Sequence, residues 1–348
     1  MKKILAILLT VIILSTGANA AFAAKVNWRL VTHASPGTEQ QRIAEVFCET
    51  VKTLSGGEFV IEPYAAGVLF PVFETFDFLA NGVIDAAMVY SAYWTGKDPG
   101  FTLTTLPGCP LSTYAEGAYL VEKLFPYFEK LYAKHRITYL GHAMVSPLYE
   151  QLISVTPINS LEDIKGKKIR TSGFGARYYS ALGATTVSLP GPEIYTALQT
   201  RNLDAAEWTF WDENMRMGLH EVANYVIDPA FQNGTCEYFP LVVNPDKWSA
   251  LPQNYKDIVK VAQDRIRYLS AMVYVHEIKS REKWKEMPNL KVVRWSPEDE
   301  QKARAIGQQL VLEECNKTPE GKEYLEIYRK TLWELGHKEA AKNLGYTE

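Results

Sequence analysis

One pattern of hydrophobic and polar positions occurs twice in this chain. Residues 74–87 and 193–206 align without a gap, and each predicts an amphipathic helix of about three turns that ends at polar turn residues and continues into a short apolar strand. Both copies end in Asp-Ala-Ala, at residues 85–87 and 204–206. Unless two short segments look alike by chance, each copy is the helix and second strand of a βαβ unit.

The flanking patterns extend each copy to the order β-α-β-α-β. A strand and an amphipathic helix precede each copy, and Gly56-Gly57 stops the first of these helices. The predicted strands are 28–32, 59–61 and 84–90 in the first half and 168–171, 186–189 and 205–208 in the second. The first helix of the second half is predicted over 175–182. Beyond Pro240 the chain predicts a strand at 241–243, a long helix over 252–287, a strand at 290–294 and helices within 297–344.

A duplicated α/β half brings the C-terminal ends of its strands toward one crevice, which is where open α/β sheets bind ligands. The residues just beyond each copy therefore become candidates for a binding site. They are Met88, Val89 and Tyr90 after the first copy and Glu207, Trp208 and Thr209 after the second.

The N-terminus predicts export. Residues 1–24 have the form of a secretory signal peptide, with two lysines, an apolar run too short to span a bilayer, and cleavage expected near Ala20 to Ala24. Removing Lys2 and Lys3 changes the formal net charge from -3 to -5, with 35 basic and 40 acidic residues left. This mild acidity argues against nucleic acid as a partner, and the predicted location is the periplasm.

Several classes of enzyme lose support. The six histidines have no metal-binding spacing, and H-E-x-x-H and G-x-S-x-G motifs are absent from the sequence. The four cysteines lie far apart and fit buried thiols. Gly173-Phe174-Gly175 lacks the rest of a dinucleotide or P-loop motif, so we expect a turn whose amides favour an anion.

Two charged residues stand at predicted strand ends. Arg170 can hold a carboxylate with two parallel hydrogen bonds, although a structural ion pair would explain it equally simply. Glu207, at the matching end in the second copy, would need a ligand ammonium, a cation or Arg170 as its partner if buried, whereas a solvated or capping Glu needs none.

Aromatic residues gather at the same strand ends, where they either line an apolar pocket or fill it. If they line it, bulky or aromatic acids fit; if they fill it, only short acids do. These residues are Tyr90, Tyr93, Trp94, Phe174, Trp208, Phe210 and Trp211.

Several motifs together resemble one family, the solute-binding proteins of tripartite ATP-independent periplasmic (TRAP) transporters, DctP type. The resemblance covers nearly the whole mature chain. It rests on Trp28-Arg-Leu30, Ala65-Ala-Gly-Val-Leu69, Gly82-Val-Ile-Asp-Ala86, Tyr93-Trp-Thr-Gly-Lys-Asp-Pro99, Ile158 to Gly166, Lys168 to Gly175, Leu203 to Trp208, and Asn244.

The resemblance implies an α/β, two-lobed periplasmic binding protein fold of type II-like form, with a hinge and a long bridging helix. Lobe I is expected at 25–145 plus 240–285 and lobe II at 146–239 plus 286–348. Arg170 matches the arginine that pairs the ligand carboxylate. Glu207 and Trp208 resemble the subgroup for 2-oxo and 2-hydroxy monocarboxylates, in which a Na or Ca ion lies beside the ligand. That subgroup's second glutamate has no direct match here, and Glu237 is the expected substitute.

The leading functional interpretation is a binding protein, not an enzyme, that captures a small organic acid and delivers it to TRAP permease subunits. The alternative is a binding protein for an aromatic or amino-acid-like ligand such as tryptophan or an indole acid. In that case Glu207 would pair with an ammonium group of the ligand. An exported enzyme ranks third. The expected oligomeric state is a monomer, because the resemblance extends to no long terminal helix beyond Leu335.

Overall fold

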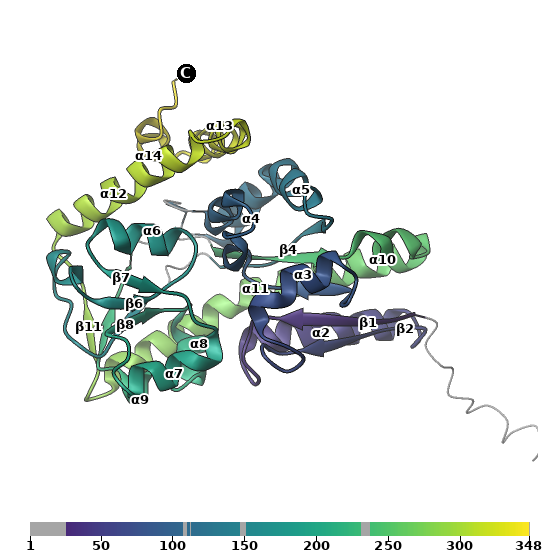
Figure 1. The fold of residues 1–348 in the computed structure, drawn as a ribbon, viewed down its shortest axis with the longest axis horizontal. Helices are drawn as coiled ribbons and strands as arrows, with labels where there is room; N and C mark the ends of the chain where they lie inside the picture. Colours follow the sequence, from purple (N-terminus) through teal and green to yellow (C-terminus); the bar gives the residue numbers. More distant parts are fainter. Residues whose placement is uncertain (1–25, 107–109, 112, 147–150, 231–236, 348) are drawn as a thin grey trace, which may run out of the picture.

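The computed structural model describes residues 26–106, 110–111, 113–146, 151–230 and 237–347. The predicted signal peptide, residues 1–24, lies outside them. Two mixed sheets with helices packed around them form the body of the protein and stand side by side (Figure 1). We call the part built on the five-stranded sheet the first lobe and the part built on the six-stranded sheet the second lobe.

The five-stranded sheet has the order β2-β1-β3-β10-β4. Its first three strands run parallel, and β10 is antiparallel to both β3 and β4. Helices α2 (Glu39–Leu54) and α3 (Thr75–Ala80) connect the parallel strands, as the periodicity predicts. The strands are β1 (Val26–Thr32), β2 (Phe59–Tyr64), β3 (Ala86–Met88), β4 (Thr138–Ser146) and β10 (Glu237–Val243).

The six-stranded sheet repeats this arrangement in the order β7-β6-β8-β5-β9-β11. Strands β7, β6 and β8 run parallel, and β5 is antiparallel to both β8 and β9. Helices α6 (Phe174–Ala181) and α7 (Gly191–Gln199) connect the parallel strands. The strands are β5 (Leu152–Ser154), β6 (Lys168–Arg170), β7 (Thr185–Val187), β8 (Ala205–Glu207), β9 (Tyr225–Ile227) and β11 (Lys291–Val293).

The two copies of the repeat fold alike, and both contain the same aspartate–backbone hydrogen bond. In the first copy a carboxylate oxygen of Asp85 accepts from the backbone N–H of Arg29, at 2.8 Å. In the second, Asp204 accepts from the backbone N–H of Lys168, also at 2.8 Å. Each aspartate thus ties the start of the second strand to its parallel neighbour, which fixes where both strands end.

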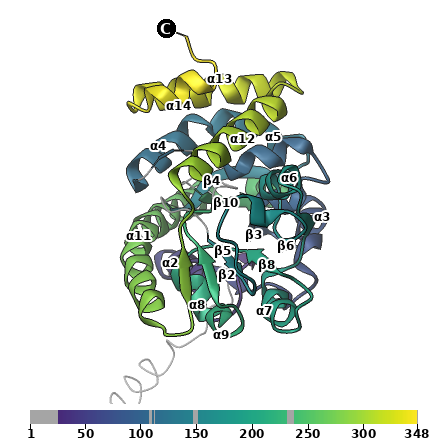
Figure 2. The same ribbon diagram turned by 90° about the vertical axis from the view of Figure 1, so that its left-hand side faces the viewer.

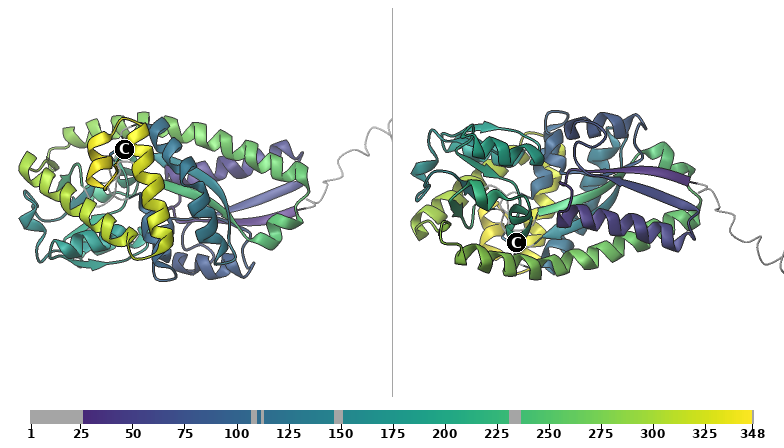
Figure 3. Two further views of the ribbon diagram at one scale, coloured as in Figure 1. Left: turned by 90° about the horizontal axis from the view of Figure 1, so that it is seen from above. Right: turned by 90° about the horizontal axis from the view of Figure 1, so that it is seen from below.

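Helices connect and cover the lobes. Helix α11 (Gln253–Glu286) packs against α2 and β4 in the first lobe and against α8 in the second, so it bridges both (Figures 1 and 3). Helices α12 (Pro297–Cys315), α13 (Pro319–Glu334) and α14 (Lys338–Asn343) form a layer at the top of the molecule (Figure 2), with α12 on α6 and α13 on α4 and α5. The other helices are η1 (Val72–Glu74), η2 (Ser91–Trp94), η3 (Pro99–Thr105), α4 (Tyr114–Lys123), α5 (Phe125–Ala133), η4 (Glu162–Ile164), α8 (Trp211–Arg216), α9 (Leu219–Val222) and α10 (Pro245–Ala250).

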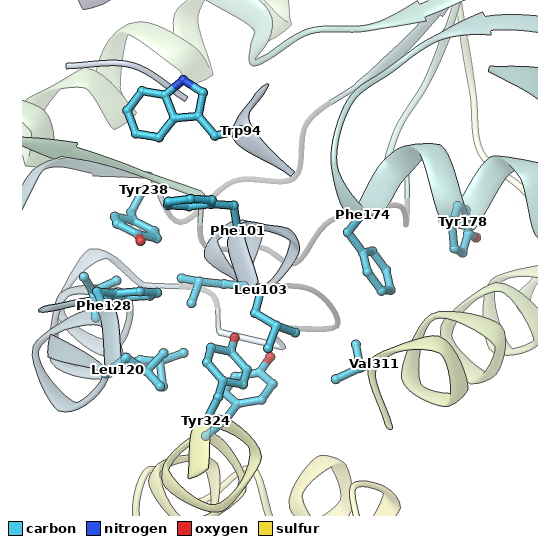
Figure 4. Packing of buried hydrophobic residues seen from close by; sticks show 14 of the residues in the cluster. Trp94, Phe101, Leu103, Leu120, Phe128, Phe174, Tyr178, Tyr238, Val311 and Tyr324 are labelled. Atoms are coloured by element: carbon cyan, nitrogen blue, oxygen red, sulfur yellow. The ribbon is translucent and has the colours of Figure 1, made fainter. Parts of the chain in front are cut away.

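The largest cluster of buried apolar side chains joins this helical layer to the rest of the protein (Figure 4) and includes Trp94, Phe101, Phe174 and Tyr324. Both described cysteines, Cys48 and Cys315, are buried free thiols. Within the described ranges, no helix combines the length and apolarity needed to cross a bilayer.

Replacing Asp85 by Ala should lower the free energy of unfolding by about 1–3 kcal/mol, because Asp85 is buried and its loss leaves the Arg29 N–H without an acceptor. Asp77→Ala is the control: Asp77 forms a surface pair with Lys97, and such pairs contribute about 0–1 kcal/mol. Urea unfolding measures both. Equal losses for the two variants would contradict the structural role of the repeated aspartate.

Candidate functional site

The strand ends of the two lobes meet. In the first lobe, β1 ends just before His33 and β3 ends shortly before Tyr93. In the second lobe, Arg170 is the last residue of β6, and Trp208 follows β8 directly. Arg170 donates from Nη2 to the Tyr93 hydroxyl at 3.2 Å, and the rings of His33 and Trp208 lie 5.9 Å apart. The crevice expected from the duplicated fold is therefore closed around these four side chains.

Arg170 is the charged centre of this group. Its side chain is only 1% exposed. Besides Tyr93, the guanidinium donates from Nε to the Leu189 backbone oxygen at 2.9 Å and from Nη1 to the Glu207 backbone oxygen at 2.6 Å. These three bonds hold the guanidinium plane in one orientation.

No Asp or Glu whose side chain the structure describes, a set that leaves out Glu237, comes within ion-pair distance, 4.0 Å, of Arg170. The carboxylate of Glu207, whose backbone oxygen accepts from Arg170, accepts at 2.8 Å from the Thr171 hydroxyl. The structural ion pair considered as the simple explanation for Arg170 is therefore not formed with any carboxylate so described. A buried guanidinium without a counter-charge is costly, so this site favours an anion.

Aromatic rings surround the charge on one side. The guanidinium carbon of Arg170 lies 4.8 Å from the centre of the Trp208 ring, a cation–π arrangement. Tyr90 and Tyr93 pack edge to face with ring centres 5.7 Å apart. The Trp208 indole N–H is buried and has no hydrogen-bond partner within the described ranges. It is therefore a hydrogen-bond donor available to a ligand beside Arg170.

His33, which the sequence reasoning did not single out, sits in the middle of these rings. It stacks on Phe239 at 4.8 Å and contacts the rings of Tyr90, Tyr93 and Trp208. Its Nδ1 lies 3.2 Å from the Met88 backbone oxygen, which can only accept, so Nδ1 carries the proton. Burial, aided by the charge of Arg170, lowers the pKa of His33 to about 4. At neutral pH His33 is uncharged and adds no second cation.

The other candidate residues lie elsewhere. Trp94 packs with Phe76, Phe101 and Tyr132, and Phe174 belongs to the same core (Figure 4). Trp211 packs edge to face on Trp284 of α11 at 5.5 Å.

Two candidates remain to be placed. Phe210 is buried immediately before α8. Glu237 begins β10 next to Ser146, and its side chain lies outside what the structure describes. The structure thus brings together Arg170, Glu207, Trp208, Tyr90 and Tyr93 from the set proposed on sequence.

This arrangement can hold an anion at Arg170. The described residues contain no group of three or more His, Cys, Asp or Glu placed to bind a metal. Hydrogen bonds orient the acidic and basic groups at the site. Glu207 accepts from the Thr171 hydroxyl, and Arg170 donates to two backbone oxygens.

The sequence profile of the DctP family, described as bacterial extracellular solute-binding protein family 7, matches residues 30–318. The chain belongs to this family. The resemblance noted from the motifs is thereby confirmed, and with it the two-lobed fold.

One relative with a described ligand class matches most of the chain. A monocarboxylate 2-oxoacid-binding periplasmic protein of Nostoc is 30% identical over 241 residues, which are 68% of this chain and 65% of the relative's own length. The match thus spans slightly less than two thirds of that protein.

Two crystal structures give the fold. A TRAP solute-binding protein of Pseudoalteromonas atlantica, described with bound sodium and pyruvate, superimposes with a TM-score of 0.81 at 24% identity over 90% of this chain and 95% of that one. One of Rhodobacter sphaeroides, described as an apo open structure, gives only 0.64 at 25% identity over 89% and 98%.

We expect Gly191→Ala to displace Trp208, because a Cβ at Gly191 would lie 2.5 Å from the Trp208 ring, closer than van der Waals contact allows. Overpacking of this kind costs roughly 1–3 kcal/mol. Gly96→Ala is the control, since nothing lies within 4 Å of its Cβ position. Thermal unfolding and tryptophan fluorescence measure the effect. A Gly191→Ala protein that matches Gly96→Ala in both would show that Trp208 is not held in place by this contact.

Proposed function

We propose that this protein captures a small monocarboxylic acid, of the 2-oxo or 2-hydroxy kind, outside the cytoplasm and delivers it to the membrane permease of a TRAP transporter. The observation that carries this proposal is Arg170: a buried guanidinium, held by backbone oxygens, with no carboxylate partner in the described chain. A ligand carboxylate supplies the missing charge.

The chemistry at Arg170 fits a carboxylate. The guanidinium uses one N–H on each of its three nitrogens for the protein and keeps others for a ligand. A carboxylate accepts such N–H groups in pairs, and bonds between two charged groups are stronger than neutral ones. The buried indole N–H of Trp208 is a further donor, and leaving it without an acceptor costs about 1–3 kcal/mol.

The surroundings favour a short acid. Three of the rings that could have lined a large pocket pack elsewhere: Trp94 and Phe174 belong to the core beside the helical layer, and Trp211 packs on Trp284 of α11. A cavity of about 20 Å³ lies beside His33 and Phe239, but neither Arg170 nor Trp208 lines it, so its volume does not set the size of the acid. Pyruvate, the ligand described for the Pseudoalteromonas protein, is a short acid.

A cation is a second part of the proposal. Glu207 is buried, keeps one carboxylate oxygen on Thr171, and lies next to Arg170 along the sheet. Oxygen ligands are what Na⁺ and Ca²⁺ prefer, so Glu207, the Trp208 carbonyl, Glu237 and the acid's own oxygens are the candidate ligands. When bound, the ion would supply positive charge beside the ligand's oxygens, and Glu207 would orient it.

The remaining expectations follow from this function. We infer that the protein works without catalysis, that residues 1–24 are a signal peptide that directs it to the periplasm, and that it is a monomer. The division into 25–145 plus 240–285 and 146–239 plus 286–348 is our proposal for the two moving lobes. An amino-acid-like or indole ligand remains the alternative, in which Glu207 holds an ammonium.

Arg170→Ala should abolish binding of pyruvate and lactate while the protein stays folded, with a loss on the order of 2–5 kcal/mol, because a charge-assisted contact in a closed site is removed. Arg170→Lys should restore only part of the binding affinity, since an ammonium group cannot offer the two parallel N–H donors of a guanidinium. Arg294→Ala, in a surface pair with Glu300, is the control. Isothermal calorimetry measures all three, and an unchanged affinity in folded Arg170→Ala would overturn the assignment.

If Glu207 holds Ca²⁺ at the ligand, chelator treatment should weaken pyruvate binding and added Ca²⁺ should restore it; if Glu207 holds Na⁺, replacing the Na⁺ of the buffer by K⁺ should weaken binding and added Na⁺ should restore it. Glu207→Gln should then bind weakly and show no response to the cation. Thermal shifts with pyruvate, lactate, phenylpyruvate, indole-3-acetate and tryptophan provide the comparison. No response to chelator, together with stabilisation by tryptophan, would support the ammonium alternative instead.

A further inference from the structure

Away from Arg170, the two lobes touch at the start of helix α2. The first N–H groups of a helix have no partner within the helix, and side chains usually cap them. The N-cap residue of α2, Thr38, makes no such side-chain cap. Instead Glu213, on α8 of the second lobe, accepts from the Glu39 backbone N–H at 3.1 Å.

A neighbouring contact crosses the same boundary. Gln40, in the first turn of α2, donates from its side chain to the Thr209 hydroxyl at 3.4 Å. Thr209 lies directly after Trp208 on the segment that leads from β8 to α8. The start of α2 is thus joined to the segment that carries the ligand-site residues of the second lobe.

We propose that Glu213 is a positioning residue that caps helix α2 only when the lobes are closed, so that closure on the ligand completes a helix of the opposite lobe. This inference rests on the proposed function, because it assumes that the lobes close around an acid. The contacts from Arg170 to Tyr93 and from Gln40 to Thr209 also join the two lobes, which is the closed arrangement that this inference assumes.

The groups facing Glu213 are mostly acidic. Glu39 of α2 pairs with Arg42, and Asp212 of α8 binds Arg216 and the Ser280 hydroxyl of α11. On α11, Glu277 accepts from the Asp212 backbone N–H at 2.9 Å. Glu213 and Glu277 are both buried.

Burial raises the pKa of Glu213 to about 7 and that of Glu277 to about 8. If opening returns Glu213 to water, its pKa falls toward the ordinary value, 4.5. The closed state then binds the proton more tightly than the open state. Closure is therefore favoured most below about pH 4.5, and this advantage is lost as the pH rises to about 7.

Two substitutions separate the cap from the charge. Glu213→Gln keeps an oxygen that accepts the Glu39 N–H but cannot titrate, whereas Glu213→Leu removes the acceptor at similar volume. The same substitutions at Glu221, an exposed residue that bonds Tyr195 within the second lobe, are the controls. The probe is pyruvate with Ca²⁺, which stays ionised throughout, in calorimetry at pH 5.5 and pH 8.

We expect Glu213→Leu to weaken pyruvate binding about tenfold at pH 5.5, where the closed wild type holds Glu213 protonated, and to lose most of the wild-type difference between the two pH values. Glu213→Gln should bind as tightly as the wild type does at pH 5.5 and should lose the same difference. The Glu221 variants should behave as wild type. Weakening of equal size in Glu213→Leu and Glu221→Leu at pH 5.5, or full affinity in Glu213→Leu at that pH, would overturn the cap.

A measurement without ligand keeps this inference separate from the proposed function. Small-angle scattering should give a larger radius of gyration for Glu213→Leu than for Glu213→Gln, and hydrogen exchange should be faster at Glu39 in the leucine variant. If these differences are seen but the wild type binds none of the acids, the cap stands and only the proposed acid ligand is overturned. Identical scattering and exchange in the two variants, both without ligand and with saturating pyruvate, would overturn the cap.

Discussion

The arrangement at the crevice depends on one buried positive charge. Arg170 is almost wholly removed from water, and within the described residues its hydrogen bonds go to backbone oxygens and a tyrosine hydroxyl. Such bonds orient a guanidinium without neutralising it, which is why we propose an anion as its partner. His33, kept neutral by its burial, and the ring of Trp208 shape the space beside this charge without competing for the anion.

The duplicated fold explains why this charge stands where both lobes can reach it. Asp85 and Asp204 fix the same hydrogen bond in the two halves, and as a result the parallel strands of each sheet end at the same level. Arg170 and Tyr93 then face each other from opposite lobes. Closure also brings Glu213 to the start of α2, so the contacts that hold the lobes together lie both at the ligand and away from it.

Much of this could be predicted from the sequence, because it depends on local periodicity. Both copies of the repeat form a helix and a parallel strand, and α11 covers nearly the whole predicted range. Helices α4 and α5 were not predicted, since their packing beneath α13 is a tertiary property. The contacts of a strand-end aromatic also depend on tertiary packing: Trp208 lies over the Arg170 guanidinium, whereas Trp94 packs on Phe101 and Trp211 packs on Trp284.

His33 could have been found from the repeat. Leu30 pairs with Ala86 in the first sheet as Ile169 pairs with Ala205 in the second, so strand β1 corresponds to strand β6. By this correspondence His33, directly after β1, matches Ser172, which lies two residues beyond Arg170. Its neutral state, however, follows from burial by rings of both lobes, which no local pattern reveals.

The most direct test of the central claim is a crystal structure of the protein grown with pyruvate and Ca²⁺. The account predicts the carboxylate of the acid within hydrogen-bond distance of the Arg170 guanidinium, with Trp208 alongside. An acid bound with its carboxylate away from Arg170, or Arg170 paired with an Asp or Glu of the chain while the acid is bound, would contradict it.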